Sequence, residues 1–153
     1  MTRNGSLLTD AKKAVVKWGG RVRRSYGDDH GDFAFRFTFR GKTFIGVSKQ
    51  SAHQGLASFE QTVTRRAAHQ DALLVEFFGE EPTLGSAYVY RPETVVEEGE
   101  ESVGNSKKGI KTEWYQLPLE KGVLLGDFVS GRGEPSEPSE EEASGPVTIN
   151  DFA

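Results

Sequence analysis

The chain of 153 residues contains no cysteine. This absence excludes disulfide bonds, thiolate zinc sites and cysteine nucleophiles. No apolar run approaches the roughly 18 residues that a membrane-spanning helix needs, and the first residues carry no apolar signal-peptide core. We therefore expect a cytoplasmic protein that does not enter a membrane. This length suffices for one domain with a hydrophobic core, but hardly for two.

Acidic residues are rare at the start of the chain and dense at its end. Residues 131–153 hold six acidic residues and one basic residue, which leaves 17 acidic and 18 basic residues for positions 1–130. Residues 1–26 hold a single acid, Asp10, against seven bases. Six of these bases are candidates for nucleic-acid binding: Lys12, Lys13, Lys17, Arg21, Arg23 and Arg24. A basic surface of this kind suits a polyanion such as DNA, although charges on a helix face can also be merely solvated.

The spacing of apolar residues predicts one α/β domain over residues 1–130. Helical spacing predicts helices over residues 7–18 and 56–70. Alternating or continuous apolar residues predict strands, over 21–26, 33–39, 43–49, 72–78, 86–90 and 110–117. Residues 131–145 consist almost entirely of Gly, Pro, Ser and Glu, which predicts a disordered acidic linker.

The most informative segment is the hairpin predicted around the first phenylalanine-rich strand. Phenylalanine occupies every second position of residues 33–39, which is the period of a half-buried strand. If Arg40 and Gly41 form the turn, Asp32 lies opposite Lys49 on the returning strand, with Cβ atoms roughly 5 Å apart. A two-residue turn one position later still keeps both side chains on the same face. The hairpin thus pairs an acid with a lysine at adjacent strand ends.

The predicted order of helix, three strands, helix and strand resembles the PD-(D/E)xK nuclease-like fold, in particular archaeal Holliday-junction resolvases, over residues 7–78. In that family an acid opens the second strand, and an acid-x-Lys triplet lies on the third. Asp32 looks like the first element, and residues 47–49, Val-Ser-Lys, look like the second. The resemblance implies a restriction-endonuclease-like core and Mg²⁺-dependent cleavage of DNA, with branched or damaged DNA among the candidate substrates.

Under this resemblance Asp32 would be the central metal ligand and Lys49 the catalytic lysine. Val47 stands where the family has its second acid and cannot bind a metal. Candidates to replace that carboxylate are Asp28, Asp29, Glu60 and Glu76. Glu76 interrupts an apolar strand, so it is functional, paired in a salt bridge or at the rim of the domain, and we favour a salt bridge at the rim.

Several alternatives remain open at this point. Asp32 could equally be an Asx-turn residue, and Lys49 an exposed lysine at the end of a strand. Val47 leaves a choice between an active nuclease and a catalytically inactive, nuclease-like protein that binds DNA or serves as an adaptor. A third interpretation is an α/β domain unrelated to nucleic acid. The sequence does not decide between a monomer and the homodimer that resolvase-like enzymes form.

The chain ends in a short apolar segment beyond the predicted linker. Residues 148–152, Thr-Ile-Asn-Asp-Phe, resemble the peptide by which archaeal and eukaryotic proteins bind the sliding clamp PCNA. Ile149 and Phe152 match two of its four anchors, whereas Pro146 and Ala153 depart from the others. The resemblance implies that residues 146–153 form a tethered clamp-binding peptide. The alternative is a frayed terminus.

Overall fold

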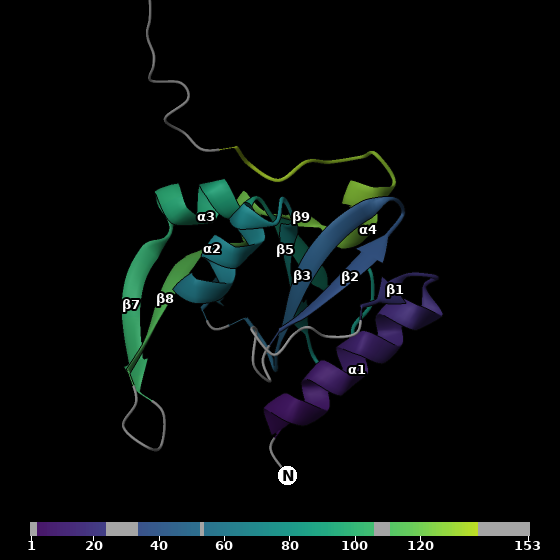
Figure 1. The fold of residues 1–153 in the computed structure, drawn as a ribbon, viewed down its shortest axis with the longest axis horizontal. Helices are drawn as coiled ribbons and strands as arrows, with labels where there is room; N and C mark the ends of the chain where they lie inside the picture. Colours follow the sequence, from purple (N-terminus) through teal and green to yellow (C-terminus); the bar gives the residue numbers. More distant parts are fainter. Residues whose placement is uncertain (1–2, 24–33, 53, 106–110, 138–153) are drawn as a thin grey trace, which may run out of the picture.

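The computed structural model describes residues 3–23, 34–52, 54–105 and 111–137, which form a mixed α/β protein (Figure 1). The larger sheet has the strand order β1 (Arg21–Val22), β2 (Phe35–Phe39), β3 (Lys42–Lys49), β5 (Leu73–Phe78), β6 (Ala87–Tyr90) and β9 (Val123–Leu124). The smaller sheet has the order β4 (Leu56–Glu60), β8 (Lys111–Pro118) and β7 (Glu100–Asn105). The helices are α1 (Arg3–Lys17), α2 (Gln61–His69), α3 (Pro92–Glu98), the 3₁₀ turn η2 (Leu119–Lys121) and α4 (Leu125–Val129). Within these ranges, no helix is long and apolar enough to cross a membrane.

The hairpin of β2 and β3 has the register that an Arg40-Gly41 turn predicts. Phe39 pairs with Lys42, and both turn residues have positive φ, 54° at Arg40 and 80° at Gly41. Two positive φ angles are typical of a type I′ turn, whose twist matches that of the strands it joins. The pairing is described from Phe39 back to Phe35, so the predicted contact between Asp32 and Lys49 lies outside the described residues.

The larger sheet separates two hydrophobic clusters. Phenylalanines of β2, β3 and β5 pack on one face with α1 and α4. On the other face Ile45 and Leu74 pack with α2, α3 and the smaller sheet. Figure 1 accordingly shows α1 and the smaller sheet on opposite sides of β3. Strand β5 is therefore covered on both faces, as its continuous apolar run predicts.

Gly46 lies where two aromatic rings leave no room for a side chain. A Cβ at this position would lie 2.7 Å from Cε1 of Phe77 and 3.1 Å from Cε1 of Phe35, and these two rings are themselves stacked. We expect Gly46→Ala to lower the free energy of unfolding by about 1–3 kcal/mol, because the rings must move apart. Urea denaturation measures the change. Gly85→Ala is the matched control, since its Cβ would meet only Thr83 Oγ1, at 3.8 Å; equal losses in both variants would contradict the steric account.

The helix predicted over residues 56–70 is wrong in its first five residues. Leu56–Glu60 form β4, which pairs antiparallel with β8, and α2 begins only at Gln61. Ala57 and Phe59 are fully buried, so burial here follows the period of two that a strand requires. The partner strand begins at Lys111, far along the chain, and local spacing could not reveal it. The acidic strand β7 was not predicted for the same reason.

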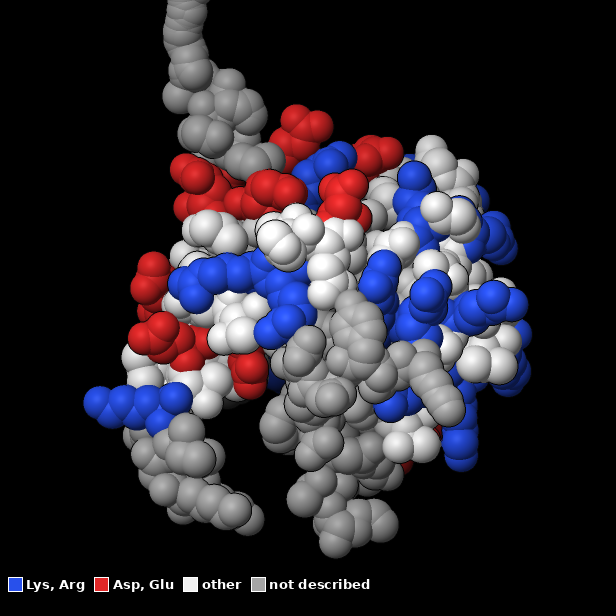
Figure 2. Space-filling model, viewed as in Figure 1, with Lys and Arg blue, Asp and Glu red and all other residues white. Residues whose placement is uncertain are grey.

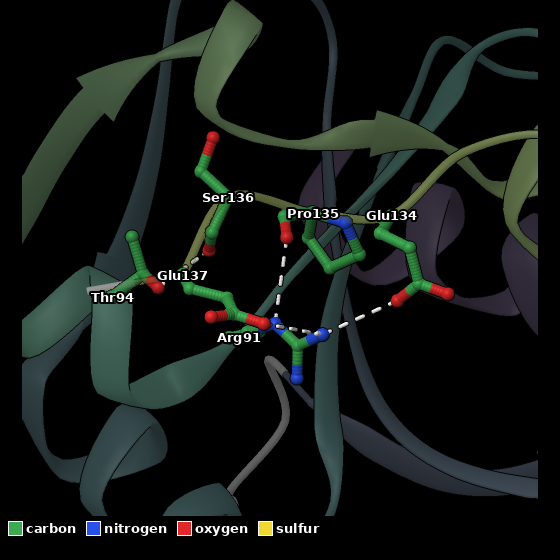
Figure 3. A network of polar contacts seen from close by, with 6 residues as sticks. All are labelled: Arg91, Thr94, Glu134, Pro135, Ser136 and Glu137. Atoms are coloured by element: carbon green, nitrogen blue, oxygen red, sulfur yellow. Dashed lines mark hydrogen bonds and ion pairs between the residues drawn. The ribbon is translucent and has the colours of Figure 1, made fainter. Parts of the chain in front are cut away.

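Residues 131–137, assigned from their composition to a disordered linker, are instead placed against the domain (Figure 3). The hydroxyl of Thr94 donates a hydrogen bond of 2.6 Å to the Ser136 carbonyl oxygen, and the Ser136 backbone N–H donates one of 3.0 Å to the Lys121 carbonyl. Arg91 lies 3.2 Å from the Glu134 carboxylate. These bonds satisfy backbone groups that the composition alone leaves to water. The rest of the predicted linker, 138–145, and the predicted clamp-binding peptide with Ile149 and Phe152 lie outside the described residues.

Candidate functional site

Three of the predicted site residues, Lys49, Glu60 and Glu76, meet where the two sheets approach each other. Strands β3 and β5 are parallel, and Val47 is the direct partner of Glu76. Residues directly opposite each other share a face of the sheet, and so do residues two positions apart on one strand. Val47, Lys49 and Glu76 therefore all face the smaller sheet, where Glu60 ends β4.

Glu76 is fully buried, in contrast to the predicted rim position. One carboxylate oxygen, Oε1, accepts a hydrogen bond of 3.0 Å from the Ser58 backbone N–H. The other, Oε2, has no hydrogen-bond partner, and Glu76 forms no ion pair within the described part of the chain. Burial raises the pKa of Glu76 to about 8, against the opposing effects of the Lys49 charge and the Ser58 hydrogen bond. Full burial excludes the rim position, and Glu76 stays a candidate functional residue.

Lys49 is held by the smaller sheet. Its ammonium group donates a hydrogen bond to the Ser58 hydroxyl and lies 4.8 Å from the centre of the Trp114 ring. Trp114 is the direct partner of Glu60 on the paired strands β8 and β4. Burial raises the pKa of Glu60, and the Lys49 charge opposes this shift. Lys49 is thus a half-buried cation that the Ser58 hydroxyl and the Trp114 ring hold in place.

A cavity of about 280 Å³ opens beside these groups. Polar walls come from Lys49, Ser58 and Glu60, together with the Trp114 indole. Its apolar walls are Leu8, Val47, Phe59 and Val63. An apolar cavity with a few convergent polar groups is the usual form of a small-molecule or substrate site. This cavity is therefore the candidate site of the molecule.

The oxygen atoms of the site fit a hard divalent cation. Mg²⁺ is usually bound by one or two carboxylates, and it keeps waters or takes substrate phosphate oxygens as its other ligands. Within the described residues, Glu76 has one buried oxygen without a hydrogen-bond partner, and Glu60, which lines the cavity, supplies a second carboxylate. Among the described residues, no three or more His, Cys, Asp or Glu side chains lie together in a group that could hold a metal ion. Asp28, Asp29 and Asp32, the other predicted candidates, lie outside the described ranges.

Basic residues gather over α1, which packs on the face of the larger sheet opposite Lys49 and Glu76. Figure 2 shows lysine and arginine gathered over α1, β1 and the β2–β3 hairpin, and acidic residues gathered around α3 and the segment 134–137. The predicted nucleic-acid-binding residues that the structure describes are all exposed: Lys12, Lys13, Lys17, Arg21 and Arg23. Arg24 lies outside the described residues. The Ser48 hydroxyl donates a hydrogen bond of 3.3 Å to the Leu7 carbonyl, which ties α1 to the end of β3 beside Lys49.

Sequence reasoning missed Ser58 and Trp114. Ser58 fell within a predicted helix, and Trp114 lay in a strand with no assigned place in the sheets. A signal was present for Trp114, since it stands on the less buried face of a strand in which Tyr115 and Leu117 alternate as core residues. A large aromatic side chain on that face is a common mark of a binding surface.

Comparisons of the chain with models of known protein families, with curated proteins and with solved structures found no match. A function for the molecule therefore has to come from the geometry around Lys49 and Glu76. A buried, incompletely paired carboxylate next to a lysine lowers the stability of the folded protein, which marks this pair as a candidate functional site.

Proposed function

We propose that this chain is a Mg²⁺-dependent endonuclease that acts on DNA and is built on a PD-(D/E)xK nuclease-like core. The observation that carries the proposal is the buried carboxylate of Glu76. It lies directly beside Val47, on the face that also carries Lys49. A carboxylate on the neighbouring strand thus stands next to the position at which the triplet of the family has its own acid.

The arrangement of the elements supports the proposed core. Helix α1 precedes the antiparallel strands β1, β2 and β3, and α2 then leads to β5, which pairs parallel with β3. This is the order that the resemblance implies, with β4 inserted before α2. The basic surface of α1 and β1 supplies charges that suit a phosphate backbone, and the hydrogen bond from Ser48 to Leu7 ties α1 to the end of β3 that carries Lys49.

Glu76, Glu60 and Asp32 would hold the metal ion, which when bound activates a water molecule and stabilises charge on the phosphate. Glu76 is largely protonated at neutral pH without a cation, because burial raises its pKa to about 8. Cation binding therefore requires Glu76 to release a proton. The Lys49 ammonium offsets negative charge that develops on the phosphate, and Ser58 orients it through the hydrogen bond to its hydroxyl.

Cleavage of labelled DNA with Mg²⁺ or Mn²⁺ tests this proposal. Duplex, single-stranded and four-way-junction substrates should be compared, with Asp32→Ala and Glu76→Gln as the variants. We expect metal-dependent cutting that both variants lose while they still bind DNA. Cutting that persists in both variants would point to a contaminating nuclease and would remove the site from consideration.

A catalytically inactive protein that binds DNA, or serves as an adaptor, is the second candidate. The specific observation in its favour is Val47, which leaves only two carboxylates, Glu60 and Glu76, in the described part of the site. No cutting by any metal, together with DNA binding that weakens as salt rises, would support it. The tail would then be the main lead, and Phe152→Ala should abolish binding to a PCNA-type clamp if Ile149 and Phe152 are its anchors.

A further inference from the structure

We propose that the cavity beneath Trp114 takes an unstacked nucleobase, so that the preferred DNA carries an unpaired nucleotide. This inference rests on the proposed function only in that the chain must bind DNA; it does not require cleavage. Trp114 belongs to the smaller sheet, outside the elements that carry Lys49 and Glu76. It would determine which nucleotide can reach them.

The placement of the Trp114 ring fits a stacking role. Tyr115 and Leu117 of β8 point into the core, whereas Trp114 lies half-buried on the other face and lines the cavity. Gly104 on β7 leaves room for the indole, since a Cβ there would lie 3.3 Å from the indole Nε1. Bases stack on aromatic side chains with little sequence preference, because every base has a π-face.

The size and lining of the cavity suit one base. Its volume of about 280 Å³ falls just below the range of about 300–1,000 Å³ that is typical for drug-sized ligands. Leu8, Val47 and Val63 offer apolar walls to the ring faces. Ser58 and Glu60 lie at the same cavity and can form hydrogen bonds with the polar edge of a base.

The Lys49 ammonium completes the nucleotide site. In the described state it lies over the Trp114 ring, a cation–π contact that a stacked base would replace. The ammonium would then turn to the phosphate of the same nucleotide, with its hydrogen bond to Ser58 as the pivot. An intact duplex cannot make this exchange until a base leaves its stack, which costs free energy.

Tryptophan fluorescence tests the inference on the full chain. The protein has two tryptophans, and Trp18 packs against Phe39 and Phe77 in the cluster on the opposite face of the larger sheet. Trp18→Phe therefore leaves Trp114 as the one reporter. Oligothymidylate and a blunt duplex of equal length should be titrated with chelator present, so that no cleavage occurs. We expect the single strand to quench the emission strongly and the duplex to quench it far less.

Two further variants keep the test decisive. Trp114→Phe leaves Trp18 as the remaining tryptophan, so the emission change of the unaltered protein minus that of this variant gives the response of Trp114 if Trp18→Phe does not fold. Trp114→Leu should weaken single-strand binding about tenfold, the scale of one lost stacking contact. Equal quenching by duplex and single strand, or none by either, would overturn the inference. Because cleavage is scored separately, a protein that cuts DNA without quenching retains its nuclease function and loses only the base pocket.

Discussion

Replacing Glu76 by glutamine is expected to raise the free energy of unfolding by up to about 5 kcal/mol above pH 8, and by almost nothing near pH 4.5. Glu76 is an acid whose pKa is higher in the folded protein, about 8, than its ordinary value of 4.5. The folded state therefore binds the proton more tightly than the unfolded chain. This contribution to stability is complete below pH 4.5, and it is lost as the pH rises to about 8. The variant carries a neutral amide at this position, so its stability does not fall in this way as the pH rises.

Urea denaturation at several pH values between 4.5 and 8, in metal-free buffer, measures this difference. The stability of the unaltered protein should fall with pH relative to that of Glu76→Gln. Glu113→Gln, at an exposed position of β8, is the matched control and should follow the unaltered protein. If the free energies of unfolding of Glu76→Gln and the unaltered protein change with pH in parallel, the prediction is contradicted. The ionised carboxylate would then be stabilised by a partner in the folded protein.

Added Mg²⁺ separates a metal ligand from a carboxylate that is merely buried. A cation that binds only the folded state stabilises it by mass action, and its charge compensates the ionised Glu76. The unaltered protein should therefore regain stability at the upper end of the pH range, while Glu76→Gln gains little. No gain in the unaltered protein would remove the metal site from the proposed function but leave the pH dependence intact.

The hairpin could be predicted from the sequence because its determinants are local. Alternating phenylalanines define the buried face of β2, and local residues leave two possible two-residue turns, of which the structure has Arg40-Gly41. The strand around Glu76 could also be predicted, because a continuous apolar run of that length is typical of a strand covered on both faces.

The surroundings of the candidate site could not be predicted in the same way. Glu76 can be recognised in the sequence as an acid within an apolar run. Its burial, however, depends on Ser58 of β4 and on a smaller sheet whose strands come from distant parts of the chain. Residues 56–60 satisfy helical and strand periodicity at once, and only the pairing with β8 decides between them. Trp114 could be assigned to a strand, but nothing local places its ring over Lys49.

Replacing Lys49 by methionine is expected to lower the rate of DNA cleavage by about 10²- to 10³-fold, with little change in DNA affinity. Methionine keeps most of the length and apolar contact of the stem but removes the charge that Ser58 and Trp114 hold in place. A charge that acts mainly in the transition state affects turnover, whereas the affinity for DNA comes mostly from the exposed lysine and arginine side chains of α1 and β1. Single-turnover cleavage and a binding titration together measure the two effects.

Lys42 provides the matched control for this prediction. It lies at the other end of the same strand, exposed, with its ammonium 5.6 Å from the centre of the Phe128 ring rather than beside Glu76. Lys42→Met removes an equal charge from β3 and should leave the cleavage rate nearly unchanged. If both variants lose activity in the same proportion as their DNA affinity, Lys49 serves the overall positive field. A loss of rate confined to Lys49→Met instead assigns the effect to the chemistry beside Glu76.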